Sequence, residues 1–160
     1  MKNSAIIFIM LLVNTSVLWA QNAQSARAQP AEDYSGMYAF LQDGEFVQLT
    51  VEDQGLVTGL ISRYGNSAGD KREFLDQFFK QGRIEGKKLT FTTKTLHEVW
   101  YNFDGIVERG DGQNVGDEGY YVLKGKLTQY ITDANKKTTT KSQQVAFKSF
   151  PKDMDSTPAK

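Results

Sequence analysis

Cysteine is absent from the 160 residues of the chain, and there is a single histidine, His97. Without cysteine there can be no disulfide, no thiol catalysis, no cysteine-bound metal and no lipid anchor on an N-terminal cysteine. A lone histidine supplies too few of the usual ligands for a zinc site. Catalysis by histidine would need a nucleophile and an orienting acid close to it in space. We therefore expect no metal and no cofactor.

The chain also lacks an excess of charge of either sign, because 19 basic residues balance 19 acidic ones. Binding of nucleic acid usually requires a basic stripe or patch. The nearest approach to one is Lys136, Lys137 and Lys141, which lie around three consecutive threonines. That pattern is typical of a solvated strand, so we expect no nucleic-acid partner.

A long apolar run is missing too, but a short one lies near the N-terminus. Lys2 precedes the apolar segment Ala5–Val13, and polar and then small residues follow it. This order is typical of a secretory signal peptide. The run is too short for a membrane span, which needs about 20 apolar residues. The pattern predicts export to the periplasm or the outside of the cell, with no stable membrane anchor after cleavage.

Two cleavage points compete, one after Ala20 and one after Ala28. The earlier point lies at the more usual distance from the apolar run, and the later one has small residues at both recognition positions. We expect a signal peptide over residues 1–20, with 28 as the alternative end. The rest of the chain then divides into a disordered leader (21–33), one domain (34–150) and a disordered tail (151–160).

The domain reads as strands separated by tight turns. In the segment Glu45–Glu52, Val47, Leu49 and Val51 alternate with polar residues, which is the period-2 pattern of a half-buried strand. Turns with glycine, such as Asp53–Gly55, separate such segments. The pattern predicts eight strands: Gly36–Leu41, Glu45–Glu52, Leu56–Arg63, Gln77–Ile84, Lys88–Thr95, Glu98–Arg109, Tyr120–Thr132 and Thr138–Phe150.

One segment, between the third and fourth strands, fits two interpretations. Asp70 and Glu73 resemble a capping box, and Phe74 and Phe78 lie four apart, as on one helical face. This favours a short helix over 70–76. The alternative is that the fourth strand already begins at Phe74.

The number and order of strands favour an all-β, eight-stranded antiparallel up-and-down barrel. Closing a meander of eight strands removes both open edges. A sandwich of two meandering sheets is the competing architecture. Parallel folds are disfavoured, because no long crossover helix is predicted.

Aromatic residues dominate the strands and give the candidate ligand site. In the pairs at 100–101 and 120–121 both faces of a strand carry rings, so one face must pack the interior. Either these rings fill the core of the barrel, or they line a cavity. The candidate ligand-binding residues of that cavity are Tyr101, Phe103, Tyr121 and Leu123.

Acidic residues gather around the segment 104–118, namely Asp104, Glu108, Asp111, Asp117 and Glu118. Carboxylates in a cleft can hydrolyse glycosides or hold calcium. The run lacks the regular alternation of a calcium loop, and strand parity places Asp104 on the face opposite to Tyr101 and Phe103. We therefore predict neither a metal site nor an enzyme.

The opening of the first strand, Ser35-Gly36-Met37-Tyr38, resembles the Gly-x-Trp start of lipocalins and the Gly-Thr-Trp start of avidins. The hairpin Gly82–Phe91 is similar to hairpins in bacterial exported lipocalin-like domains. The resemblance implies a barrel with an internal cavity, and it implies a contact between Tyr38 and a basic residue of the last strand, such as Lys148. An avidin-like biotin site calls for several tryptophans, whereas Trp100 alone lies beyond the leader, so biotin is disfavoured.

The leading functional prediction is an exported, non-enzymatic binding protein for a small apolar or amphipathic molecule. The alternative is a structural or interaction protein with a filled core that acts through its outer face. The sequence leaves the oligomeric state open.

Overall fold

A computed structural model describes residues 32–65, 69–70 and 73–152. The predicted signal peptide (1–20, or to 28), most of the predicted leader and residues 153–160 of the predicted tail lie outside the described residues. Within the described ranges, no helix is long and apolar enough to cross a membrane.

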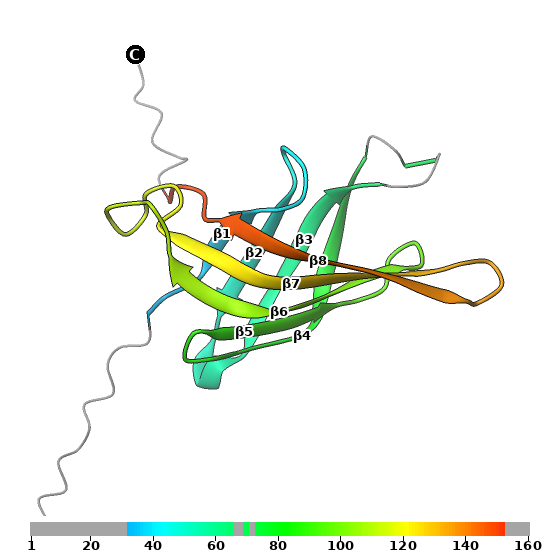
Figure 1. The fold of residues 1–160 in the computed structure, drawn as a ribbon, viewed down its shortest axis with the longest axis horizontal. Helices are drawn as coiled ribbons and strands as arrows, with labels where there is room; N and C mark the ends of the chain where they lie inside the picture. Colours follow the sequence, from blue (N-terminus) through cyan, green and yellow to red (C-terminus); the bar gives the residue numbers. More distant parts are fainter. Residues whose placement is uncertain (1–31, 66–68, 71–72, 153–160) are drawn as a thin grey trace, which may run out of the picture. The chain divides into compact units, whose positions relative to one another are not determined.

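All eight predicted strands are present, and each pairs antiparallel with its neighbour in sequence in one sheet of order β1 to β8 (Figure 1). The up-and-down meander is therefore confirmed, and the two-sheet sandwich is not observed. The strands are β1 (Gly36–Ala39), β2 (Phe46–Val51), β3 (Val57–Tyr64), β4 (Phe74–Glu85), β5 (Lys88–Thr93), β6 (Val99–Arg109), β7 (Tyr121–Thr132) and β8 (Thr138–Lys148).

The sheet curls until its two edges meet, and they meet at one end only. Tyr38 of β1 bridges to Ser149, just after β8, and the N–H of Phe150 donates to the carbonyl of Met37 at 2.8 Å. Strand β1 has 4 residues and β8 has 11, so β1 cannot cover the length of β8. The β7–β8 hairpin projects beyond the other strands in Figure 1.

The helix predicted over 70–76 is wrong, and the alternative strand is correct; residues 71 and 72 of that range lie outside the described residues. β4 begins at Phe74, which pairs with Tyr64, while Phe78 pairs with Leu60. A spacing of four residues places two side chains on one face of a strand as well as of a helix, because four is even. The resemblance to a capping box reflects a turn, in which the N–H of Glu73 donates to the carbonyl of Asp70 at 2.9 Å.

Aromatic rings fill the interior between the strands. Phe103 is fully buried and its ring centroid lies 5.2 Å from that of Phe91 and 6.3 Å from that of Phe147. Phe40 connects this group to Tyr101, because its ring centroid lies 5.2 Å from that of Phe147 and 5.6 Å from that of Tyr101. Such contacts each contribute about 0.5–1.5 kcal/mol beyond the burial of apolar area. The centre of the curled sheet is thus a packed aromatic core.

Candidate ligand-binding site

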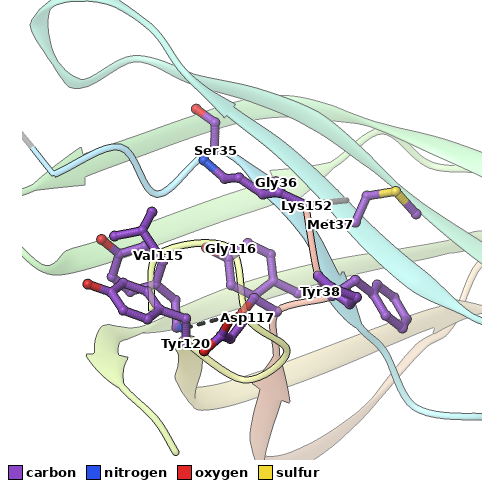
Figure 2. Close-up of a pocket in the computed structure, with 13 residues that line it drawn as sticks. Ser35, Gly36, Met37, Tyr38, Val115, Gly116, Asp117, Tyr120 and Lys152 are labelled. Carbon is purple, nitrogen blue, oxygen red and sulfur yellow. Dashed lines mark hydrogen bonds between the residues drawn. The ribbon is translucent and has the colours of Figure 1, made fainter. Parts of the chain in front are cut away.

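A pocket lies at the end of the sheet where β1 and β8 meet (Figure 2). Its volume is about 340 Å³. The wall comes from the start of β1, from the loop between β6 and β7, and from the segment after β8. We call it the end pocket; its lining residues are Ser35, Gly36, Met37, Tyr38, Val115, Gly116, Asp117, Tyr120, Tyr121, Ser149, Phe150, Pro151 and Lys152.

The β6–β7 loop owes its shape to Asp117. One oxygen of its carboxylate accepts the N–H groups of Gln113 at 3.0 Å and Asn114 at 2.7 Å. These hydrogen bonds, that of Asn114 first, hold the pKa of Asp117 below its ordinary value. The N–H of Lys152 donates to the carbonyl of Gly116 at 3.0 Å, so the loop is also fastened to the segment after β8.

Most of the side chains around the end pocket are apolar or aromatic. Met37 comes from β1, Val115 and Tyr120 from the β6–β7 loop, and Phe150 and Pro151 from the segment after β8. Figure 2 shows the residues of β1 across the pocket from Val115 and Tyr120. Pockets for small molecules commonly combine such walls with a few polar groups.

Two hydroxyl groups supply polar character in the wall. The Oγ of Ser35 accepts the N–H of Val51 at 3.0 Å, and the Oγ of Ser149 accepts the N–H of Tyr121 at 3.2 Å. Because each hydroxyl acts as an acceptor in these bonds, its own hydrogen remains to be donated. A ligand with a carbonyl or ether oxygen could accept it.

Tyrosines surround the base of the pocket in a water-poor setting. The Tyr38 hydroxyl donates to the carbonyl of Tyr34 at 2.6 Å, and the ring of Tyr34 meets that of Tyr121 edge to face at 5.0 Å. Burial raises the pKa of Tyr38 far above its ordinary value, and the neighbouring Tyr121, Asp33 and Tyr34 add to the shift. These phenols stay neutral hydrogen-bond donors at physiological pH.

Of the four residues that the sequence suggested for the ligand, one lines this pocket. Tyr121 lies in its wall, whereas Phe103 and Leu123 are fully buried in the aromatic core. Tyr101 is buried near the other end of the sheet, where its hydroxyl accepts a hydrogen bond from Gln129 at 3.0 Å. A role of these four in ligand binding remains a prediction.

Residues that sequence reasoning did not select complete the pocket. Val115 and Lys152 lie in irregular segments, where no periodicity shows which way a side chain points. The one available signal was the motif Ser35–Tyr38, which forms the β1 side of the wall. The resemblance implied a contact between Tyr38 and Lys148; the side chain of Lys148 is exposed and pairs with Asp111 at 3.6 Å.

The other candidate residues are separated from one another. The Nδ1 of His97, which is half exposed, lies 2.7 Å from the carboxylate of Asp70. Asp104 is exposed, as parity predicted, and Glu108 pairs with Lys124 at 2.8 Å. Among the residues described, no three histidine, aspartate or glutamate side chains gather as a metal site requires.

No family model matches the chain, and no curated protein matches it by sequence. Solved structures match it by fold at 14% identity. Rhizavidin in complex with biotin aligns with a TM-score of 0.53 over 72% of this chain and 98% of its own. A second rhizavidin structure gives 0.54 over 74% and 84%, and apo short afifavidin gives 0.51 over 72% and 94%. The likeness shows an avidin-like, eight-stranded β-barrel fold.

Proposed function

We propose that this protein is an exported, non-enzymatic binding protein that holds a small apolar or amphipathic molecule in the end pocket. The observation that carries the proposal is a pocket of about 340 Å³ whose wall is mostly apolar or aromatic and includes two serine hydroxyls. Small-molecule sites usually span about 300–1,000 Å³ and have this division between apolar wall and a few polar groups. The signal-peptide pattern at the N-terminus supports export.

The structural likeness supports a binding role of this kind. Rhizavidin, which shares the fold, was solved as a complex with biotin. Biotin itself remains disfavoured for this chain, because Trp100 is the only tryptophan beyond the predicted leader. An amphipathic molecule fits better, since its apolar part can lie against Met37 and Val115 while an oxygen accepts from Ser35 or Ser149.

Native mass spectrometry of the protein purified from its own cells tests the proposal first. A stoichiometric extra mass that disappears on denaturation is the expected result, and its value indicates the class of ligand. Fatty acids and aromatic metabolites are then screened for stabilisation against heat. A bare protein that no mixture stabilises would contradict the proposal.

A matched pair of variants places the ligand. Val115 is 66% exposed in the pocket wall, so Val115→Asp should fold and weaken binding at least tenfold by placing a charge against the apolar part. Ile106, 42% exposed and outside the pocket, is the control, and Ile106→Asp should bind normally. Equal affinities in the two variants would exclude the end pocket as the site.

A second candidate function is self-association through the outer face of β3 and β4. Phe74 and Phe78 are 50% and 54% exposed there, and Phe74 lies against Tyr64 at 4.4 Å between ring centroids. The formal net charge of zero gives two copies no strong mutual repulsion. Sedimentation should then show a dimer that Phe78→Ser converts to a monomer, whereas a wild-type monomer at high concentration would exclude this function.

A further inference from the structure

The charged side chain of Arg63 is buried inside the curled sheet, at the end opposite to the end pocket. Arg63 lies near the end of β3, only 2% exposed, and is among the largest fully buried side chains described. An arginine is almost never buried unless it is paired, because it keeps its charge and cannot release a proton under ordinary conditions. The hydrogen-bond partners of its guanidinium group therefore indicate what kind of ligand this site can bind.

The protein satisfies only part of the guanidinium group. The Nε donates to the side-chain oxygen of Gln77 at 3.1 Å, and the Nη1 donates to the carbonyl of Tyr64 at 3.1 Å. The Nη2 is buried and has no hydrogen-bond partner. It is the one buried side-chain nitrogen or oxygen in this state among the residues described.

No carboxylate neutralises this charge within the described part of the chain. None of the ion pairs there, defined by an N–O distance of 4.0 Å or less, includes Arg63. Two buried acids lie at this end, and both have other partners. The two oxygens of Glu45 accept the N–H groups of Tyr64 at 2.9 Å and Gln42 at 3.1 Å, and the carboxylate of Asp70 lies 2.7 Å from the Nδ1 of His97. Among the described residues, no carboxylate therefore lies within ion-pair distance of Arg63, and a buried charge without such a partner strongly destabilises a folded protein.

The surroundings of Arg63 are preorganised. Gln77 is 1% exposed, and its Nε2 shares its two hydrogens among three acceptors, the Oγ1 of Thr93 and the carbonyls of Lys94 and Val99. This fixes the oxygen that orients the guanidinium group. The ring of Tyr101 lies 5.6 Å from the Arg63 guanidinium carbon.

A second donor belongs to Tyr101, whose ring centroid lies 5.6 Å from the Arg63 guanidinium carbon. The Tyr101 hydroxyl accepts a hydrogen from the Nε2 of Gln129 at 3.0 Å, so its own hydrogen remains to be donated. An N–H donor with a full positive charge and a neighbouring O–H donor form a recognition pair for an anionic oxygen. Charge-assisted bonds from arginine to a carboxylate are among the strongest hydrogen bonds in proteins.

We propose that Arg63 and Tyr101 form an anion site that takes the carboxylate of a small molecule at this end of the barrel. Gln77 is a positioning residue, because it holds the guanidinium group without being needed as a donor to the anion. The site is separate from the end pocket, so it does not depend on the function proposed above.

The test uses the purified protein and sodium acetate as the probe. Acetate replaces chloride at constant sodium concentration while thermal unfolding is followed. Acetate at ten times its dissociation constant should raise the ratio of folded to unfolded protein about elevenfold. Equal stability in acetate and in chloride would overturn a carboxylate site.

Variants assign the effect to the two donors. Arg63→Met should lose the acetate response, and Tyr101→Phe should weaken apparent acetate affinity by roughly fivefold, the value of one lost hydrogen bond. The control is Arg83→Met, which removes an exposed arginine paired with Glu85 and should keep the full response. An undiminished response in Arg63→Met would overturn the proposal.

Two further measurements keep the result unambiguous. If Arg63→Met does not fold, NMR of the arginine side-chain nitrogens in the wild-type protein replaces the variant. Acetate should then shift one arginine signal. The signal is assigned to Arg63 because it disappears in Arg63→Lys. A uniform small shift of all arginine signals would contradict the site. Val115→Asp should retain the acetate response even while it loses the ligand of the end pocket, so that the two proposals fail independently.

Discussion

The two ends of the barrel solve the problem of polar groups in different ways. At the end pocket, the carboxylate of Asp117 and the ammonium of Lys152 lie at the surface, where solvent can add to the protein groups that they contact. At the opposite end, Arg63, Gln77 and Glu45 are each no more than 3% exposed, so protein atoms or a ligand must serve them. The difference teaches that a buried polar group is the more specific indicator of what a site binds, because an open one can be satisfied by solvent.

The aromatic core lies between the two ends and should stabilise both of them. A substitution of Phe103 tests this. Phe103→Ala should lower the free energy of unfolding by about 3–5 kcal/mol, because it removes a fully buried ring that two other phenylalanines contact. Urea unfolding measures the change. Ile106→Ala, at an exposed position on the same strand, is the control and should cost less than about 1 kcal/mol. Similar losses in both variants would show that the core is not shared.

Removing one hydrogen-bonding side chain from each end should lower the free energy of unfolding by different amounts. Gln77→Leu leaves the Arg63 Nε and the carbonyls of Lys94 and Val99 without their partner, and should cost about 3 kcal/mol. Ser149→Ala leaves the N–H of Tyr121 without its acceptor. It should lower the free energy of unfolding by about 1 kcal/mol, because this end is more open. Equal losses in urea unfolding would erase the contrast between the ends.

Alkaline pH provides a third comparison, between Tyr38 and Tyr101. Burial raises the pKa of both, but the charge of Arg63 opposes the shift at Tyr101. A raised folded-state pKa gives stability that is complete below the unfolded pKa of 10.0 and is lost as the pH rises from there towards the folded pKa. Each such tyrosine should contribute a slope of up to about 1.4 kcal/mol per pH unit.

Urea unfolding between pH 8 and pH 11 measures that slope. Tyr38→Phe should flatten the loss of stability above pH 10 more than Tyr101→Phe does. The reverse order would show that Arg63 does not act on Tyr101 through its charge.

The smallest effect is expected at the turn that carries His97 and Glu98, at the Arg63 end. Both residues have positive φ, 47° and 59°, and a two-residue hairpin of this kind favours glycine. Glu98→Gly should therefore raise the free energy of unfolding by about 0.5–1 kcal/mol. Glu108→Gly, inside β6, is the control and should lower it by a similar amount. Destabilisation by Glu98→Gly would show that its side chain contributes more than its backbone costs.

The strands could be predicted from the sequence because alternation and turns agree along the chain. In β2, Val47 and Leu49 are buried and Gln48 and Thr50 exposed, as the period of two requires. The start of β4 could not be predicted with the same ease, since Phe74 and Phe78 fit a helix and a strand equally. There the pairing with β3 decides, and pairing is a property of the folded sheet.

The end pocket could be predicted only in part, because Val115 and Lys152 take their positions from loop geometry. The anion site, in contrast, left a signal in the sequence. Arg63 shares strand parity with Val57 and Ile61, which face the interior, so an inward charge was implied once β3 was recognised. The export, the cleavage site and the ligand stay predictions, because a fold does not determine them.

The meeting of β1 and β8 over one bridge has a consequence for the order in which the molecule comes apart. Every other pairing joins neighbours in sequence, whereas Tyr38 and Ser149 lie at opposite ends of the domain. The contact should therefore form last in folding, because the loop it closes carries the largest entropic cost. In native-state hydrogen exchange, the amides of β1 should open as a separate unit before the long β6–β7 ladder, so that the barrel loosens along a single seam.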